Sequence, residues 1–168
     1  MLYKILWGCA LTAFAVAATS AQTKSSISGT CAKADVEQSV PAGDQPGHLF
    51  MVAQGKCTTK GEVGGQTSKS GAYSEHRDVT ANRIKAAGVY VETYDSGDKI
   101  IYNYQMSMGL KDGALQAGKG TYQVTGGTGK FKGIKGTGTC AYTGGANGTN
   151  DYSCTGDYTL AGGAAAPK

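Results

Sequence analysis

Gly88-Val-Tyr-Val-Glu-Thr-Tyr-Asp95-Ser-Gly-Asp98-Lys-Ile-Ile-Tyr-Asn-Tyr-Gln-Met-Ser-Met108 is the stretch of sequence that decides the fold of this chain. Two runs rich in β-branched and aromatic residues flank the short turn Ser96-Gly97, which predicts an antiparallel β-hairpin. A two-residue turn pairs Asp95 with Asp98. This pairing fixes which side chains share a face, because alternate residues of a strand point to opposite sides of the sheet.

The predicted register divides the hairpin into two faces. On the first, which is apolar and is the default inward face, Thr93, Val91 and Val89 lie opposite Ile100, Tyr102 and Tyr104. The second face carries Glu92 between two tyrosines, and Asn103 lies on the same face. If this second face points inward instead, it supplies a carboxylate ringed by hydroxyls that could bind or polarise a ligand. The candidate ligand-binding residues are therefore Tyr90, Glu92, Tyr94, Tyr102, Asn103 and Tyr104.

The composition of the whole chain supports a β fold. Glycine accounts for 27 of the 168 residues, well above its usual share of about 7%. Glycine inside a helix costs roughly 0.5–1 kcal/mol per residue, which excludes a long-helix protein. Glycine does not recur at every third residue, which excludes a collagen helix. A hydrophobic content of 40% with ten tyrosines excludes a disordered chain. A small all-β domain remains.

The first 21 residues predict a signal peptide. Lys4 precedes an apolar run over residues 5–18, and Thr19-Ser20-Ala21 offers small residues to a signal peptidase, so we expect cleavage after Ala21. A retained N-terminal anchor is the alternative, although the run is shorter than the roughly 20 residues of a membrane span. The predicted chain is exported, periplasmic or extracellular, with no membrane segment after cleavage. It consists of a β-barrel domain over 22–161 and a disordered tail over 162–168.

Signal cleavage leaves four cysteines, Cys31, Cys57, Cys140 and Cys154. An oxidising compartment favours two disulfides over free thiols. Of the three possible pairings, Cys31–Cys57 with Cys140–Cys154 is favoured, because each pair brackets a turn-rich segment between two strand-like segments. The close Cys-x₂₋₄-Cys spacing of a zinc site is missing and neither histidine is near a cysteine, so no metal site is predicted.

The rest of the chain predicts about eight strands separated by turns. Residues 58–71 are expected to form a long flexible connection, 35–47 a loop, and 81–87 a segment of modest helical character. Phe131 and Ile134, on or beside a predicted helical turn, are expected to plug one end of the fold. Closing the strands into a barrel leaves no exposed edge. The predicted fold is a single eight-stranded antiparallel β-barrel.

Charge and glycine patterns exclude two classes of partner. Without Lys4 the 16 basic side chains become 15, against 12 acidic ones, and a net charge of +3 without a basic cluster does not predict nucleic-acid binding. The segment Gly126–Gly133 lacks the spacing of a phosphate-binding loop, and no dinucleotide motif occurs. No cofactor is predicted.

One further cluster, Glu75-His76-Arg77-Asp78, carries ionisable groups. Strand alternation puts Glu75 and Arg77 on one face and His76 and Asp78 on the other. A His–Asp pair could transfer protons, and ordinary surface charge is the alternative interpretation.

The glycine-rich stretch also carries a resemblance. Gly118-Lys-Gly-Thr-Tyr-Gln-Val-Thr-Gly-Gly-Thr-Gly-Lys-Phe-Lys-Gly-Ile-Lys-Gly-Thr-Gly138, together with Thr93-Tyr-Asp-Ser-Gly-Asp-Lys99, resembles the allene oxide cyclase-like barrels, a group that includes plant dirigent proteins. It is especially similar to small exported bacterial proteins of that type. The resemblance implies an eight-stranded barrel with a central cavity. In plants the group includes a cyclase of an unstable fatty-acid epoxide and proteins that steer phenoxy-radical coupling, but no catalytic position is carried over to this chain.

Three functions follow as hypotheses. The first is an exported barrel that binds a small apolar or phenolic ligand without catalysis. The second is an isomerase or cyclase that shapes a reactive substrate in the barrel lumen. The third is a protein-binding module or inhibitor that acts through residues 58–71.

Overall fold

A computed structural model describes residues 22–161 as nine strands and two short 3₁₀ turns. The predicted signal peptide (1–21) and tail (162–168) lie outside the described residues. No helix in the described part is long and apolar enough to cross a membrane. The elements are β1 (Thr23–Cys31), β2 (Val36–Pro41), β3 (Leu49–Val63), β4 (Gln66–Thr80), β5 (Arg83–Tyr94), β6 (Lys99–Lys111), β7 (Ala114–Gly127), η1 (Gly129–Phe131), β8 (Lys135–Gly144), η2 (Ala146–Gly148) and β9 (Asn150–Thr159).

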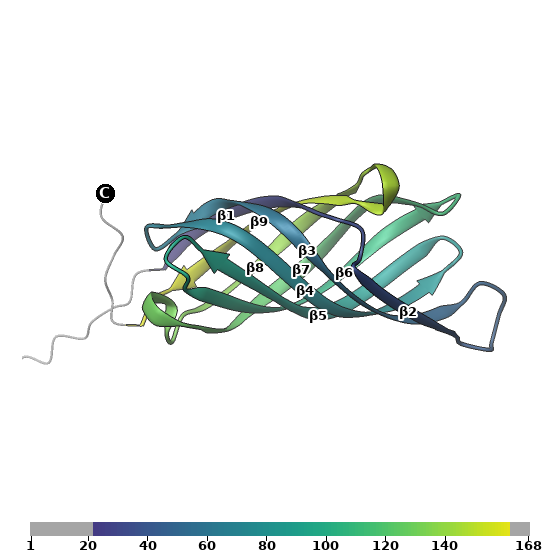
Figure 1. Cartoon of the computed structure of the whole chain (residues 1–168), viewed down its shortest axis with the longest axis horizontal. Coiled ribbons are helices and arrows are strands. Elements are labelled where there is room, and N and C mark those ends of the chain that lie inside the picture. The colour runs from purple at the N-terminus through teal and green to yellow at the C-terminus, as the bar shows by residue number, and fades with distance from the viewer. Residues whose placement is uncertain (1–21, 162–168) are drawn as a thin grey trace, which may run out of the picture.

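The strands form the predicted eight-stranded antiparallel barrel (Figure 1). Every strand pairs with its neighbour in sequence from β3 to β9, and β1 closes the ring by pairing with both β9 and β3. The additional strand β2 pairs with β3 beyond the point where β1 ends, as Figure 1 shows. It occupies residues 36–41, so the prediction of a loop over 35–47 is wrong for that part. The prediction of fold class is confirmed.

Two further segments differ from the sequence prediction. Residues 58–71 form the facing ends of β3 and β4 rather than a flexible connection, with Gly64 and Gly65 in the left-handed region at the turn. Residues 81–87 hold a tight turn and the start of β5, not helical structure. The first of these predictions was wrong because of the polarity of the barrel interior. The interior of this barrel accepts polar side chains such as Thr59 and Ser68, so these strands lack the usual alternation of apolar and polar residues.

The central hairpin is present, but its predicted register is wrong by one residue. Gly97 adopts a φ of +85°, and Tyr94 and Asp98 close a three-residue loop instead of a two-residue turn. Tyr90 consequently pairs with Tyr102. A one-residue shift sends the side chains of one strand to the other face relative to its partner. The second face of β5 therefore points inward together with the predicted apolar face of β6.

Both predicted disulfides are confirmed. Cys31–Cys57 joins β1 to β3, and Cys140–Cys154 joins β8 to β9, in each case between directly opposite residues. The pairing of β1 with β3 covers only five residue pairs, fewer than the β1–β9 pairing on its other side. A disulfide typically contributes about 2–4 kcal/mol. The first bridge therefore reinforces the short seam that closes the barrel.

One end of the barrel is plugged as predicted. Phe131 on η1 and Ile134 beyond it are 1% and 3% exposed. The Phe131 ring packs against Tyr94, with the ring centroids 4.6 Å apart, and Ile100 is buried beside them in the same apolar cluster. This plug gives the barrel one closed end.

Tyrosine rings fill much of the interior by lying against glycines of neighbouring strands. The hydroxyl ends of Tyr73 and Tyr90 lie over Gly55 and Gly71, positions where a Cβ atom would overlap the ring. Tyr152 covers Gly29 in the same way, and Tyr122 covers Gly138 and Gly156. We call these the glycine–tyrosine contacts. They explain why glycine occurs inside strands here, since only glycine leaves room for a ring to lie against the wall.

Replacing Gly71 with alanine tests these contacts. The new methyl group would overlap the Tyr90 hydroxyl and force the ring away from the wall. Overpacking of this kind costs about 1–3 kcal/mol of the free energy of unfolding, which urea denaturation would measure. Gly126→Ala is the matched control, because its Cβ meets only Ile101 Cδ1 at 3.9 Å. Equal stability of the two variants would contradict the argument.

Candidate functional site

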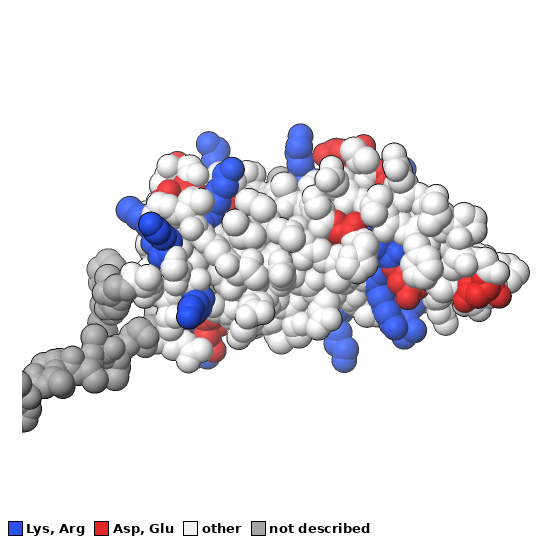
Figure 2. Space-filling model, turned by 90° about the horizontal axis from the view of Figure 1, so that it is seen from below, with Lys and Arg blue, Asp and Glu red and all other residues white. Residues whose placement is uncertain are grey.

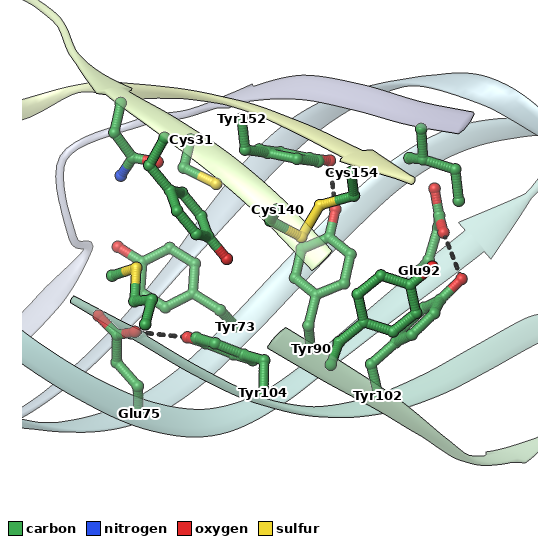
Figure 3. A pocket seen from close by; sticks show the side chains of 15 residues that line it. Cys31, Tyr73, Glu75, Tyr90, Glu92, Tyr102, Tyr104, Cys140, Tyr152 and Cys154 are labelled. Atoms are coloured by element: carbon green, nitrogen blue, oxygen red, sulfur yellow. Dashed lines mark hydrogen bonds between the residues drawn. A yellow bond between two sulfur atoms is a disulfide. The ribbon is translucent and has the colours of Figure 1, made fainter. Parts of the chain in front are cut away.

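A cavity occupies the barrel lumen between the plug and the opposite end (Figure 3). It offers about 80 Å³ to the centres of water-sized molecules, on a measure in which one water needs about 10–15 Å³. Seven of its fifteen lining residues are tyrosines, and two are glutamates. Nine of the chain's ten tyrosines lie within the described residues, and all nine belong to the interior cluster. The lumen is therefore a phenol-lined chamber.

Five of the six candidate residues from the hairpin face this interior, namely Tyr90, Glu92, Tyr94, Tyr102 and Tyr104. Asn103 is exposed on the outer surface, so the expected placement of Glu92 and Asn103 on one face is absent. Tyr94 lies within the plug side of the interior rather than on the cavity wall. The sequence analysis missed further cavity residues on other strands, chiefly Tyr73, Glu75, Tyr122, Tyr142, Asn150 and Tyr152.

Glu92 is a fully buried carboxyl, with no exposed surface. Tyr94 and Tyr102 each donate a hydrogen bond of 2.9 Å to its Oε2 atom, and Ser68 donates to Oε1. Ser68 is in turn hydrogen-bonded to Thr59. Three hydroxyls from β4, β5 and β6 thus hold one carboxyl in a fixed position at the plug end of the cavity.

Burial raises the pKa of Glu92 above the ordinary value of 4.5. The hydrogen bonds from Ser68, Tyr102 and Tyr94 favour the charged form and oppose this shift without cancelling it. No salt bridge to Glu92 occurs among the described residues. The group is a buried carboxyl that retains its proton to higher pH than an exposed one.

Glu75 is a second buried carboxylate and lies toward the opposite end of the cavity. Its Oε1 accepts a 2.6 Å hydrogen bond from Arg77 Nε, and its Oε2 accepts one from the Tyr104 hydroxyl (Figure 3). Arg77 also contacts Glu37 of β2, with 3.6 Å between Nη1 and Oε2. Unlike Glu92, Glu75 has a cationic partner.

A pair of tyrosines lies between the two glutamates. The hydroxyls of Tyr90 and Tyr152 are 2.9 Å apart, as the dashed line in Figure 3 marks, and each ring lies against a glycine. Burial raises the pKa of Tyr90, Tyr102 and Tyr104 well above the usual value for a phenol. These phenols stay protonated and are available as hydrogen-bond donors.

The predicted faces of the cluster at 75–78 are observed, but its histidine and aspartate do not form a pair. Glu75 is buried and His76 is exposed on the outside. The Asp78 carboxylate instead accepts a 3.0 Å contact from Nε2 of His48, whose Nδ1 contacts Asp44 at 2.7 Å. This arrangement fastens the loop before β3 to β4, outside the cavity.

No protein-family model matches the chain, and no curated protein matches it either. Among solved structures it is similar to a pterocarpan synthase dirigent protein, at 9% sequence identity and a TM-score of 0.48, with 91% of this chain and 99% of that chain covered.

The chemistry available in the cavity is that of protonated phenols and carboxyl groups. Among residues 22–161 no cluster of three His, Cys, Asp or Glu side chains could hold a metal ion. The lining offers flat aromatic faces, several hydroxyl donors and two carboxyl acceptors, one with a cationic partner and one without. Such a surface suits a flat, partly polar molecule and could also move a proton at Glu92.

The stability of the barrel should depend on pH through Glu92. The raised pKa means that the folded chain holds this proton more tightly than the unfolded chain does. The resulting stabilisation is fully present below about 4.5 and is lost as the pH rises through the folded-state pKa. The free energy of unfolding of the wild type, relative to Glu92→Gln, should therefore fall as the pH is raised.

Urea denaturation of both proteins across the range from about pH 4 to about pH 8 measures this difference. Glu62→Gln, which removes an acidic group from the exposed outer face of β3, is the matched control. A difference between the wild type and Glu92→Gln that stays constant over this range would refute the assignment.

Proposed function

We propose that this protein binds a small, largely apolar or phenolic molecule in the lumen of its barrel. The observation that carries the proposal is the cavity itself, which is walled by tyrosines, two of which, Tyr102 and Tyr104, donate their hydroxyls to buried carboxyl groups. Ligand pockets are typically concave and mostly apolar, with a few placed polar groups. Because the wall is preformed, the site loses little conformational entropy when a ligand binds.

We further propose that the protein works outside the cytoplasm. Two disulfides are formed within the described residues, and such bridges persist in oxidising compartments. The N-terminal sequence pattern points the same way. A ligand available there, rather than a cytoplasmic metabolite, is the expected occupant.

The flexible loop that the protein-binding hypothesis named as an example is absent, because residues 58–71 form part of the barrel wall. The lumen is the site that our proposal puts to the test.

Blocking the cavity tests the proposal. Calorimetry and thermal-shift measurements against a panel of neutral phenols and lipids are expected to find ligands that raise the melting temperature. Asn150 lies on the cavity wall, and Asn150→Trp would fill part of the lumen and lower the affinity for these ligands at least about tenfold. Asn103→Trp, the same substitution on the outer surface, should leave the affinity unchanged. If no compound of the panel binds, or if both variants lose affinity equally, the proposal is overturned.

A second candidate function is isomerisation of a bound substrate. It is favoured by one observation, the buried Glu92 carboxyl, whose pKa is raised by burial and whose oxygens lie among phenol donors. Positioned acids and bases of this kind assist proton transfer at carbon next to a carbonyl group. The lumen would orient the substrate while Glu92 supplies or removes the proton.

Deuterium exchange into a neutral phenolic ketone, 4-hydroxyphenylacetone, tests this second candidate. In D₂O the protein is expected to speed exchange at the carbon atoms next to the carbonyl, as proton NMR would show. Glu92→Gln should abolish the acceleration, and Tyr104→Phe should reduce it if the substrate is held by that hydroxyl. An exchange rate equal to that in buffer would overturn the proposed isomerisation, and the proposal of ligand binding would still stand.

A further inference from the structure

The charged groups that line the cavity are of one sign, whereas the outer surface of this protein carries both signs. Every lysine in residues 22–161 is exposed on the outside, and the face shown in Figure 2 carries both Lys or Arg and Asp or Glu side chains on a largely uncharged surface. The fifteen residues lining the cavity include Glu75 and Glu92 but no Lys, Arg or His. The lumen is thus acidic inside a basic chain.

The two luminal glutamates are not equivalent. Glu75 is paired with Arg77, whose guanidinium also contacts Glu37, so this cation is already shared by two carboxylates. Glu92 accepts hydrogen bonds from three hydroxyls and has no cationic partner within the described residues. A carboxylate has about four acceptor sites. Three are occupied, one on Oε1 and two on Oε2, which leaves one acceptor site on Oε1 without a donor.

The aromatic rings of the cavity wall also favour a cation over an anion. The rings of Tyr90, Tyr102, Tyr122 and Tyr152 lie in contact with one another, at centroid distances of 5.4–6.1 Å. The face of a tyrosine ring is the negative side of its quadrupole and attracts a cation. An anion in the same place would meet ring faces and carboxyl oxygens, and it would have to stay buried without a partner.

We propose that the lumen selects its ligands by charge, taking amine-bearing aromatic molecules in preference to neutral ones and rejecting aromatic carboxylates, with Glu92 as the counter-ion. This inference rests on the proposed function, because it concerns the ligand of the same cavity. The ammonium group of the ligand takes the free acceptor site of Glu92, and its ring lies among the tyrosines.

Three small phenols that differ in charge make the test direct. Tyramine carries an ammonium group, 4-ethylphenol is neutral, and 4-hydroxyphenylacetate carries a carboxylate at neutral pH. Calorimetry with the wild-type protein should rank their affinities in that order, with tyramine at least about tenfold tighter than the carboxylate. No substituted protein is needed for this ranking.

Two substitutions assign the effect to residues. Glu92→Gln should bring the affinity for tyramine to within about threefold of that for 4-ethylphenol, because the counter-ion is gone while the wall remains. Glu75→Gln should improve binding of 4-hydroxyphenylacetate, because it frees Arg77 from one of its two carboxylates. Glu62→Gln changes the net charge equally but on the outer face, and should leave all three affinities as they are.

The outcomes separate the inference from the function on which it rests. Equal binding of all three compounds, or tightest binding of the carboxylate, overturns charge selection while ligand binding in the lumen stands. A loss of tyramine preference in Glu62→Gln as large as that in Glu92→Gln would also overturn it. Failure of all three compounds to bind the wild type at millimolar concentration overturns both proposals for phenols.

Discussion

The contact between a luminal tyrosine and a glycine of the neighbouring strand is the constraint on which the rest of this structure depends. A β-barrel of eight strands has an interior just wide enough for side chains to fill. Here rings such as Tyr73 and Tyr90 lie against the wall because Gly55 and Gly71 leave the space beside them free. A chamber remains in the middle. Glycine on one strand and tyrosine on the next together produce a barrel with a cavity, which neither residue type would produce alone.

The position of the rings also determines the polarity of the chamber. A phenol that lies along the wall points its hydroxyl at residues of other strands, and Tyr102 and Tyr104 reach Glu92 and Glu75 in this way. A buried carboxyl is costly unless its oxygens are hydrogen-bonded. The tyrosine hydroxyls therefore offset the free-energy cost of burying the glutamates, while the glutamates hold these phenols in one orientation. The site is a consequence of how the barrel is packed rather than an addition to it.

The sequence predicted the barrel, the disulfides and the plug because each depends on a local signal. Cysteine parity, the hairpin runs and the apolar pair Phe131 and Ile134 can be recognised without knowing the partners across the sheet. The inward face of the hairpin could not be recognised, because it depends on a single residue. A loop longer by one residue at Gly97 changed which side chains of β5 and β6 share a face. That difference brought Glu92 inside with Tyr102 and placed Asn103 outside.

The missed residues of the site have a related cause. Glu75 belongs to β4, whose inward residues include Ser68 and Arg77. The sequence of this strand therefore shows no continuous apolar face. A strand with a polar inner face resembles a loop or a surface strand, and periodicity alone cannot distinguish them. The signal that could have revealed it is the pairing of interior glycines with tyrosines on adjacent strands. Gly55 opposite Tyr73 would have placed Tyr73 and, two residues on, Glu75 inside the barrel.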